Sequence, residues 1–298
     1  MRSAVLEVDR IAKRYGDVVA CKDVTFAVHP GDVFGLVGAG STTLLRLVLG
    51  VLVPDSGAVR LGGEPITLAV RRRVGYLPAE RGLYPRMRVH DQLVYLAELH
   101  GHTTNDAHRA TDLWLARFGL RARSADRVRQ LSAADRQRLH LAAALVHGPD
   151  LLVLDEPFTG LEPDTAETLA DVLAERAGAG VPVLLAAASL DVVERVCDRV
   201  GVLHNGRMVA VGALGEFRAH ARAEIVVDAP AAKDGWAAAL PGVTVLTVHN
   251  GLTTLTLGDG PADADDQAVL AAALATGPVR GFTRREPSLA DLFLGVAE

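Results

Sequence analysis

The chain has 298 residues, of which 49% are hydrophobic and 22% are charged, an ordinary balance for a soluble globular protein. Its formal net charge is −5 and it has no basic stripe with interleaved aromatic residues, so nucleic acid is not an expected partner. The longest apolar run, Val181–Leu190, is about half of the roughly 20 residues that a membrane-spanning helix needs, and the first residues lack a secretory signal pattern. We therefore expect a cytosolic protein, with Cys21 and Cys197 as reduced thiols because they form no CxxC pair.

The N-terminal segment is predicted to form antiparallel strands. Its apolar residues alternate or pair in four short stretches, Ala4–Val8, Val18–Ala20, Val24–Val28 and Val59–Leu61. Three further apolar runs are typical of buried strands, and each is followed by a turn and then a helical pattern. They are Val33–Val37, Leu151–Leu154 and Val183–Ala187. The sequence thus predicts an α/β protein with a parallel core sheet and an antiparallel β edge.

The middle of the chain is predicted to be helical. Val89–His100 and Ala107–Phe118 carry apolar residues at spacings of three and four, which is the period of an amphipathic helix. We expect a helical subdomain over residues 80–148.

The sequence changes character near Gly215–Ala221, which predicts a domain boundary between residues 1–216 and 217–298. The second part reads as a small α+β domain in which Asn250-Gly251 is a strong β-hairpin signal, because both turn positions need a positive φ. The expected elements are the strands Glu224–Val227, Val243–Val248, Leu252–Leu257 and Val279–Arg284 and the helices Ala231–Leu240, Ala262–Ala275 and Pro287–Glu298.

A glycine-rich stretch after the run Val33–Val37 is a candidate phosphate-binding loop. In the pattern G-x-x-x-x-G-K-[ST], glycines let backbone N–H groups surround a phosphate at the start of a helix, and the lysine adds a charge. Gly35, Gly40 and Thr42 fit this spacing, whereas Ser41 stands in the lysine position. The candidate nucleotide-contacting residues are Gly38, Ala39, Gly40, Ser41, Thr42 and Thr43. The alternative is an ordinary strand–turn–helix with glycines for packing.

Two carboxylates follow the apolar run Leu151–Leu154. In a phosphate-loop protein, Asp155 would hold Mg²⁺ together with Thr42, and Glu156 would orient the attacking water. The stretch QLSAADRQRLHLAAALVHGPD lies directly upstream, an order that is hard to reach by chance. Ser132, in this stretch, has the alternative role of a helix cap, with Asp135 three residues on.

The ordered motifs together resemble the ATP-binding subunit of an ABC transporter. They are KRYG, GAGSTTLLRLVLG, VGYLPAERGLYPRMRVHDQL, LSAADRQRLHLAAAL, LLVLDEPFTGLEPD and VVERVCDRVGVLHNGRMVAVG, and the ending PSLADLFL is similar to the accessory domain of subunits that pair with a separate permease. The resemblance implies a phosphate-loop NTPase cassette that binds ATP and Mg²⁺, with Tyr15 stacking on adenine and Ser132 contacting nucleotide. It also implies a membrane permease as partner, a homo- or heterodimer of cassettes, and a location at the inner face of the cell membrane.

Several motif positions depart from the family pattern. The loop lacks about three residues as well as the lysine, and alanine stands in place of the usual polar or glycine residue at Ala79, Ala134 and Ala188. Glu162 replaces an aspartate. Two hypotheses therefore stand after the sequence: an ATP-binding subunit that drives a permease, and a catalytically silent scaffold that keeps the fold.

Overall fold

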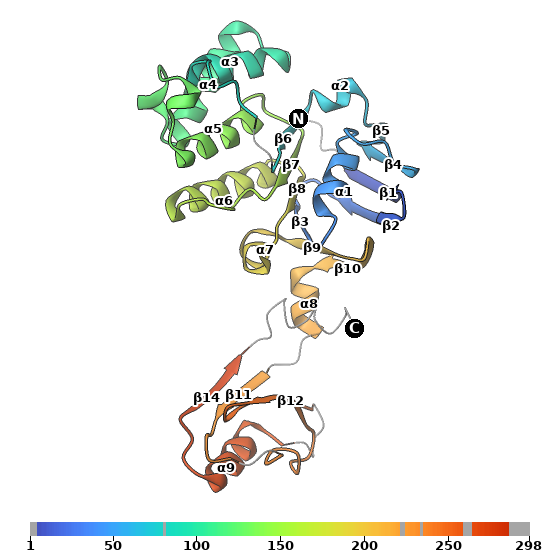
Figure 1. Ribbon diagram of the computed structural model, residues 1–298, viewed down its shortest axis with the longest axis vertical. Helices are drawn as coiled ribbons and strands as arrows, with labels where there is room; N and C mark the ends of the chain where they lie inside the picture. Colours follow the sequence, from blue (N-terminus) through green and yellow to red (C-terminus); the bar gives the residue numbers. More distant parts are fainter. Residues whose placement is uncertain (1–4, 80–81, 221–223, 233–234, 259–263, 286–298) are drawn as a thin grey trace. The chain divides into compact units, whose positions relative to one another are not determined.

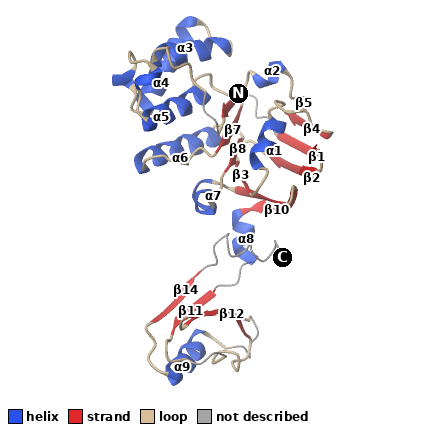
Figure 2. Ribbon diagram, viewed as in Figure 1, coloured by secondary structure: helices blue, strands red, loops and turns tan. Residues whose placement is uncertain are grey.

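The computed structural model describes residues 5–79, 82–220, 224–232, 235–258 and 264–285. The chain forms two compact units, Met1–Leu214 and Gly215–Glu298 (Figure 1). Helices and strands alternate along most of the first unit, and the second combines a sheet with helices (Figure 2). In the described ranges, no helix is both long and apolar enough to cross a membrane.

A six-stranded sheet lies at the centre of the first unit. Its strands run in the order β10-β9-β3-β8-β7-β6, and all neighbours from β9 to β6 are parallel, whereas β10 adds an antiparallel edge. The strands are β3 (Val33–Val37), β6 (Val74–Leu77), β7 (Leu151–Asp155), β8 (Val183–Ala186), β9 (Arg199–His204) and β10 (Arg207–Ala213). Every residue of β7 and β8 is buried, as expected of parallel strands that are covered on both faces. The predicted parallel core sheet is confirmed.

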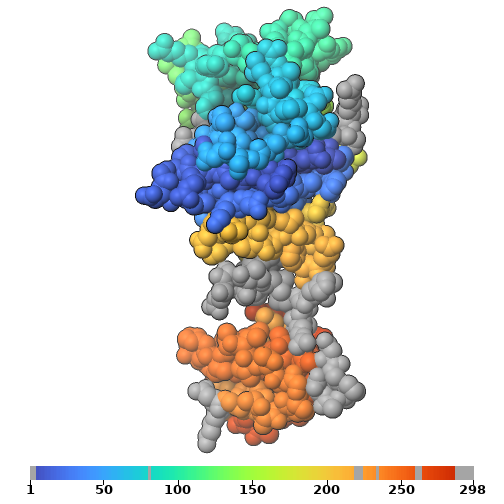
Figure 3. All heavy atoms as spheres, turned by 90° about the vertical axis from the view of Figure 1, so that its right-hand side faces the viewer, coloured from blue at the N-terminus to red at the C-terminus, as the bar shows by residue number. Residues whose placement is uncertain are grey.

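A four-stranded antiparallel sheet, in the order β2-β1-β4-β5, forms the predicted β edge. Its strands are β1 (Leu6–Tyr15), β2 (Val18–Val28), β4 (Ser56–Leu61) and β5 (Glu64–Pro65), and the atoms of this sheet, in blue, lie at the surface in Figure 3. The prediction of two separate strands, Val18–Ala20 and Val24–Val28, was wrong, because β2 is continuous. The left-handed residues Arg10 (φ 47°) and Asp23 (φ 57°) accompany register shifts in the β1–β2 pair. Such a bulge lets a strand pass through a polar stretch without ending.

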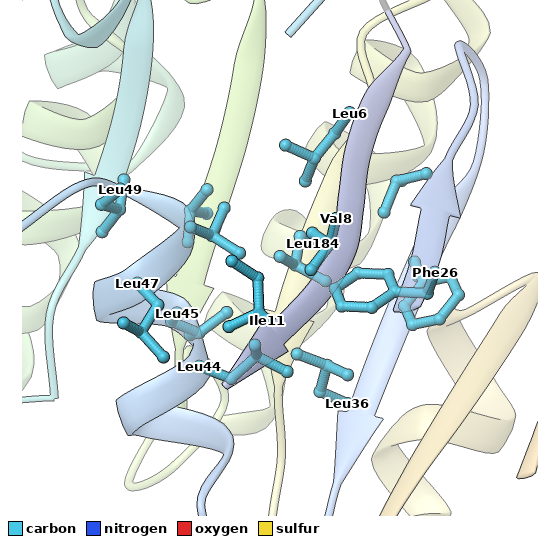
Figure 4. Packing of buried hydrophobic residues seen from close by; sticks show 14 of the residues in the cluster. Leu6, Val8, Ile11, Phe26, Leu36, Leu44, Leu45, Leu47, Leu49 and Leu184 are labelled. Atoms are coloured by element: carbon cyan, nitrogen blue, oxygen red, sulfur yellow. The ribbon is translucent and has the colours of Figure 1, made fainter. Parts of the chain in front are cut away.

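The main core lies between these two sheets, around helix α1 (Ser41–Val48). Leu44, Leu45, Leu47 and Val48 are buried, and Figure 4 shows the leucines of this helix among side chains from β1, β2, β3 and β8. Truncating one such buried leucine to alanine typically costs about 2–5 kcal/mol. The helix that follows the glycine loop is therefore fixed in place by its apolar side.

The predicted helical insertion is confirmed as α3 (Val89–Leu99), α4 (Thr104–Arg117) and α5 (Ala133–Leu145), which lie together in Figure 1. The remaining helices of this unit are α2 (Leu68–Arg71), α6 (Pro163–Gly178) and α7 (Leu190–Val196), with short 3-10 turns at Arg121–Arg123 and Val128–Gln130. Beyond the end of α5, the His147 ring lies 3.8 Å from that of His100, and its Nε2 lies 3.2 Å from the Val74 carbonyl oxygen. Burial, with His100 beside it, lowers the pKa of His147 to about 3.

The second unit is the predicted small α+β domain. It contains α8 (Leu214–His220) except for its first residue, α9 (Asp266–Thr276) and a sheet of order β12-β13-β11-β14. The strands are β11 (Glu224–Asp228), β12 (Val243–His249), β13 (Leu252–Leu257) and β14 (Gly281–Arg285). Asn250 (φ 50°) and Gly251 (φ 82°) form the predicted turn between β12 and β13.

One predicted helix of this unit, Ala231–Leu240, was wrong, because its described residues form turns. Gly235 has a φ of 84°, which a right-handed helix cannot contain, and the indole Nε1 of Trp236 donates to Thr253 Oγ1 on β13. The segment is thus tied to the sheet as a loop. The predicted last helix, Pro287–Glu298, lies outside the described residues.

Candidate functional site

Only three residues, Gly38–Gly40, connect β3 to α1. Gly38 and Gly40 have φ values of 109° and 101°, in the region that favours glycine. A Cβ on Gly38 would lie 1.9 Å from the carbonyl oxygen of Leu203 in β9, so no larger residue fits there. The loop is short, as the sequence predicts, because β3 keeps all five of its residues.

Ser41, in the lysine position, faces its own loop. Its Oγ donates to the Gly38 carbonyl oxygen at 2.7 Å, and the residue is only 8% exposed. The hydroxyl therefore closes a tight turn and contributes no positive charge. A lysine at this position would lose that hydrogen bond.

Asp155, at the end of β7, lies beside the first turn of α1. Thr42 Oγ1 donates to Asp155 Oδ1 at 3.2 Å, and the aspartate is 1% exposed. Its other oxygen, Oδ2, has no hydrogen-bond partner among the described residues. Burial raises the pKa of Asp155, while the Thr42 hydroxyl and the Arg46 charge act in the opposite direction. A hydroxyl and a carboxylate oxygen that lacks a partner are the hard oxygen donors that Mg²⁺ accepts, so these two residues fit the metal that the family implies.

Glu156, the next residue, adopts a left-handed backbone conformation with a φ of 51°. Its carboxylate is half-buried, and Oε2 accepts a hydrogen bond from Thr159 Oγ1 at 3.0 Å. Such a conformation in a non-glycine residue costs about 1–3 kcal/mol and is common at functional sites.

These segments line one cavity of about 520 Å³. Its walls are the predicted residues Gly38–Thr43, Asp155 and Glu156, together with Val37 and Ala186–Ala188. Ala188 is one of the three alanines that depart from the family pattern, and it adds no polar group to the cavity wall. Among the described lining residues, the two carboxylates are the only charged side chains.

Two predicted site residues lie outside this cavity. Tyr15 ends β1 with 48% of its surface exposed, and Lys13 Nζ is 5.9 Å from its ring centroid. Ser132 caps α5, since its Oγ accepts a hydrogen bond from the Asp135 amide at 3.0 Å. The predicted capping role of Ser132 is thus confirmed, while its contact with nucleotide remains a prediction.

Sequence reasoning missed two residues near the cavity, Thr159 and Gln137. Thr159 donates to the Glu156 carboxylate, and Gln137 Nε2 donates to the Thr159 carbonyl oxygen at 2.7 Å. The only signal was position: Thr159 follows Glu156 by three residues, and Gln137 lies one helical turn after Ala133. Neither spacing indicates such a bond.

A strand, a glycine turn and a helix, with a buried acidic strand end beside them, define a phosphate-loop nucleotide-binding fold. Comparison with known families gives the finer assignment. Residues 21–159 match the family described as ABC transporter, and residues 212–297 match the C-terminal domain of DrrA1-3-like ATP-binding proteins. The chain belongs to the family of ABC transporter ATP-binding proteins.

Individual relatives agree with this assignment. The chain is 33% identical to the ABC transporter ATP-binding protein YhaQ of Bacillus subtilis, with 97% of both chains covered. It is 36% identical to the Nod factor export ATP-binding protein I of Paraburkholderia xenovorans over 72% of both chains.

The solved structure of an ABC transporter ATP-binding subunit matches 72% of this chain and 92% of its own, with a TM-score of 0.68 and 28% identity. CbiO1 of Clostridium perfringens, part of the transporter complex cbiONQ, matches 72% and 90% of the two chains with a TM-score of 0.63 and 25% identity. These similarities favour an ATP-binding subunit over the silent scaffold that the altered motif residues left open.

Proposed function

We propose that the cavity at the end of β3 binds ATP with Mg²⁺. The backbone N–H groups at the start of α1 face the phosphates, and Thr42 and Asp155 hold the metal. Mg²⁺, when bound, supplies positive charge at the phosphates, and Glu156 orients the attacking water. The observation that carries this proposal is the hydrogen bond from Thr42 to the buried Asp155, one of whose carboxylate oxygens lacks a partner among the described residues.

Nucleotide affinity in this cavity is lower than a lysine-containing loop would give. A charge-assisted hydrogen bond is worth about 1.5–3 kcal/mol, or roughly 10- to 150-fold in affinity. Ser41 supplies no such contact, because its hydroxyl is bonded to Gly38 within the loop. Turnover is correspondingly slow, since Ala188 also lacks a polar group.

The chain acts together with other proteins in this proposal. Residues 1–216 serve as the cassette and residues 217–298 as an accessory domain. Two cassettes dimerise, Tyr15 stacks on adenine in one, and Ser132 of the facing cassette completes the nucleotide site. A separate membrane permease holds the dimer at the inner face of the membrane. Support comes from CbiO1, which is part of a transporter complex, and from a relative named for Nod factor export.

A calorimetric titration with ATP, with and without Mg²⁺, tests the nucleotide site. The variant is Thr42→Val, and the matched control is Thr168→Val, whose hydroxyl donates to the Asp164 carbonyl oxygen within α6. Thr42→Val is expected to weaken binding of the magnesium complex about tenfold and to leave metal-free binding unchanged. Glu156→Gln is expected to keep the affinity and to lower phosphate release. Binding that does not depend on Mg²⁺, or no binding at all, would contradict the proposal.

A further inference from the structure

Helix α5 makes close side-chain contacts with the loop that links β7 to α6. Gln137 is 6% exposed, and its Nε2 donates to the Thr159 carbonyl oxygen at 2.7 Å. One residue further on, Arg138 Nη2 lies 2.6 Å from Glu162 Oε2, and Arg138 Nε donates to Thr165 Oγ1 at 2.9 Å. Two consecutive residues of α5 therefore hold both ends of the segment Thr159–Glu162.

The same loop carries the hydroxyl that bonds to Glu156. Thr159 Oγ1 lies 3.0 Å from Glu156 Oε2, while the Thr159 carbonyl oxygen accepts the bond from Gln137. A single residue thus links α5 to the carboxylate at the cavity. Gly160, the next residue, has a φ of 72°, which lets the chain turn away directly after these contacts.

The loop's own backbone bonds are longer than those contacts. The Thr159 amide lies 3.3 Å from the Glu156 carbonyl oxygen, and the Leu161 amide lies 3.2 Å from that of Phe158. Hydrogen bonds weaken with length, so the shorter bonds from the buried Gln137 and from Arg138 contribute more to fixing this turn. A left-handed backbone conformation at a non-glycine residue persists only where its surroundings hold it, so these contacts also support the conformation of Glu156.

We propose that Thr159 is a positioning residue for the Glu156 carboxylate, and that Gln137 and Arg138 of α5 fix the orientation of Thr159. The inference rests on the proposed function, in which Glu156 orients the attacking water. A movement of α5, whose N-cap is Ser132, is transmitted through Gln137 to Thr159 and from there to Glu156.

Hydrogen exchange of the intact chain tests the hold of α5 on the loop without requiring activity. The variant is Gln137→Leu, and the matched control is Gln92→Leu. Gln92 is also buried, at 1% exposure, and it too bonds to a loop backbone group, the Tyr84 amide, at 2.8 Å. Gln137→Leu is expected to speed exchange of the amides between Phe158 and Glu162 about tenfold, as for the loss of one hydrogen bond. Gln92→Leu should leave these amides unchanged. Equal exchange of these amides in wild type and Gln137→Leu would overturn the proposal.

Kinetics of ATP hydrolysis test the link from Thr159 to Glu156. Thr159→Val is expected to lower kcat about tenfold without changing KM, and Thr159→Ser, which keeps the hydroxyl, should retain wild-type kcat. A wild-type kcat in Thr159→Val would overturn the positioning role. A wild-type protein without Mg²⁺-dependent turnover would refute the proposed function instead, and the exchange comparison would still decide whether α5 holds the loop.

Discussion

Replacing Asp155 by asparagine is expected to stabilise the cassette at alkaline pH. Asp155 is 1% exposed, and one of its oxygens has no partner among the described residues. A buried polar group without a partner costs about 1–3 kcal/mol, and a charged one costs more. Asparagine has nearly the same shape, keeps a carbonyl oxygen for the Thr42 hydroxyl and carries no charge. We expect a gain of about 1–2 kcal/mol in the free energy of unfolding, close to 2–8 °C in Tm for a unit of this size.

The pH dependence of this gain has a defined sign. Burial raises the pKa of Asp155 in the folded protein above its ordinary value of 3.8. As the pH rises from 3.8 to the folded-state value, the unfolded chain loses its proton first, so the wild type loses stability in that window. The advantage of Asp155→Asn should therefore be full at pH 8 and should shrink as the pH falls toward 3.8.

Urea unfolding followed by circular dichroism at pH 8 and pH 5 measures this advantage. The control is Asp171→Asn on α6, which is exposed and should change stability by less than about 0.5 kcal/mol. Saturating ATP with Mg²⁺ should raise the Tm of the wild type more than that of Asp155→Asn, which lacks one of the two proposed metal ligands. If Asp155→Asn is no more stable than the wild type at pH 8, burial of the Asp155 carboxylate does not carry the energetic cost that we infer.

Three further changes test the loop and the histidine pair. Gly38→Ala should lower the free energy of unfolding, measured by thermal denaturation, by about 3 kcal/mol or more, because its Cβ would meet Leu203. The control Gly119→Ala (φ 68°), whose Cβ would have no atom within 4 Å, should lower it by only about 1 kcal/mol. Similar losses in the two variants would contradict the close approach of Leu203 to Gly38. Ser41→Lys should leave phosphate release at the wild-type level, because the loop stays short and Ala188 remains; turnover typical of intact cassettes would refute this. His147→Gln should make the free energy of unfolding in urea less sensitive to acid. The pKa of His147 is about 3 in the folded protein against 6.5 in the unfolded chain, so the wild type loses about 2 kcal/mol of stability from this group between pH 6.5 and pH 5. An equal loss in the variant would argue against the lowered pKa.

The sequence predicted the core sheet well because buried parallel strands are continuous apolar runs. The run Val33–Val37 matches β3 residue for residue, and Asn250-Gly251 turns where the hairpin signal lies. The predictions of secondary structure were wrong where contacts with residues distant in the sequence determine the local conformation. The alanine-rich segment Ala231–Leu240 has a helical composition, but the bond from Trp236 to Thr253 and the positive φ of Gly235 hold it as turns. No local pattern reveals such a contact.

In the candidate site, too, local sequence patterns predict some features and distant contacts decide others. The motif spacing predicts the loop, Thr42, Asp155 and Glu156 as site residues, and the structure brings them to one cavity although the loop follows β3 and the carboxylates lie at the end of β7. The bond of Ser41 to Gly38 and the contact of Gln137 with Thr159 depend on side-chain orientation and on the approach of α5. A motif therefore shows which residues can meet a ligand, while the packing around it decides what they can do.

The charge balance of the cavity depends both on the residues of the motif and on the packing around them. The charged groups among its described lining residues are Asp155 and Glu156, both negative, and Arg46 acts on Asp155 from outside this lining. A triphosphate in the same space would repel both carboxylates, because like charges at short range raise each other's energy. Helix α1 contributes only a partial positive charge at its first turn. Since Ser41 cannot supply the missing cation, the proposed function requires the metal to provide the opposing charge, and we expect nucleotide binding to depend on Mg²⁺ more steeply than in a cassette whose loop carries a lysine.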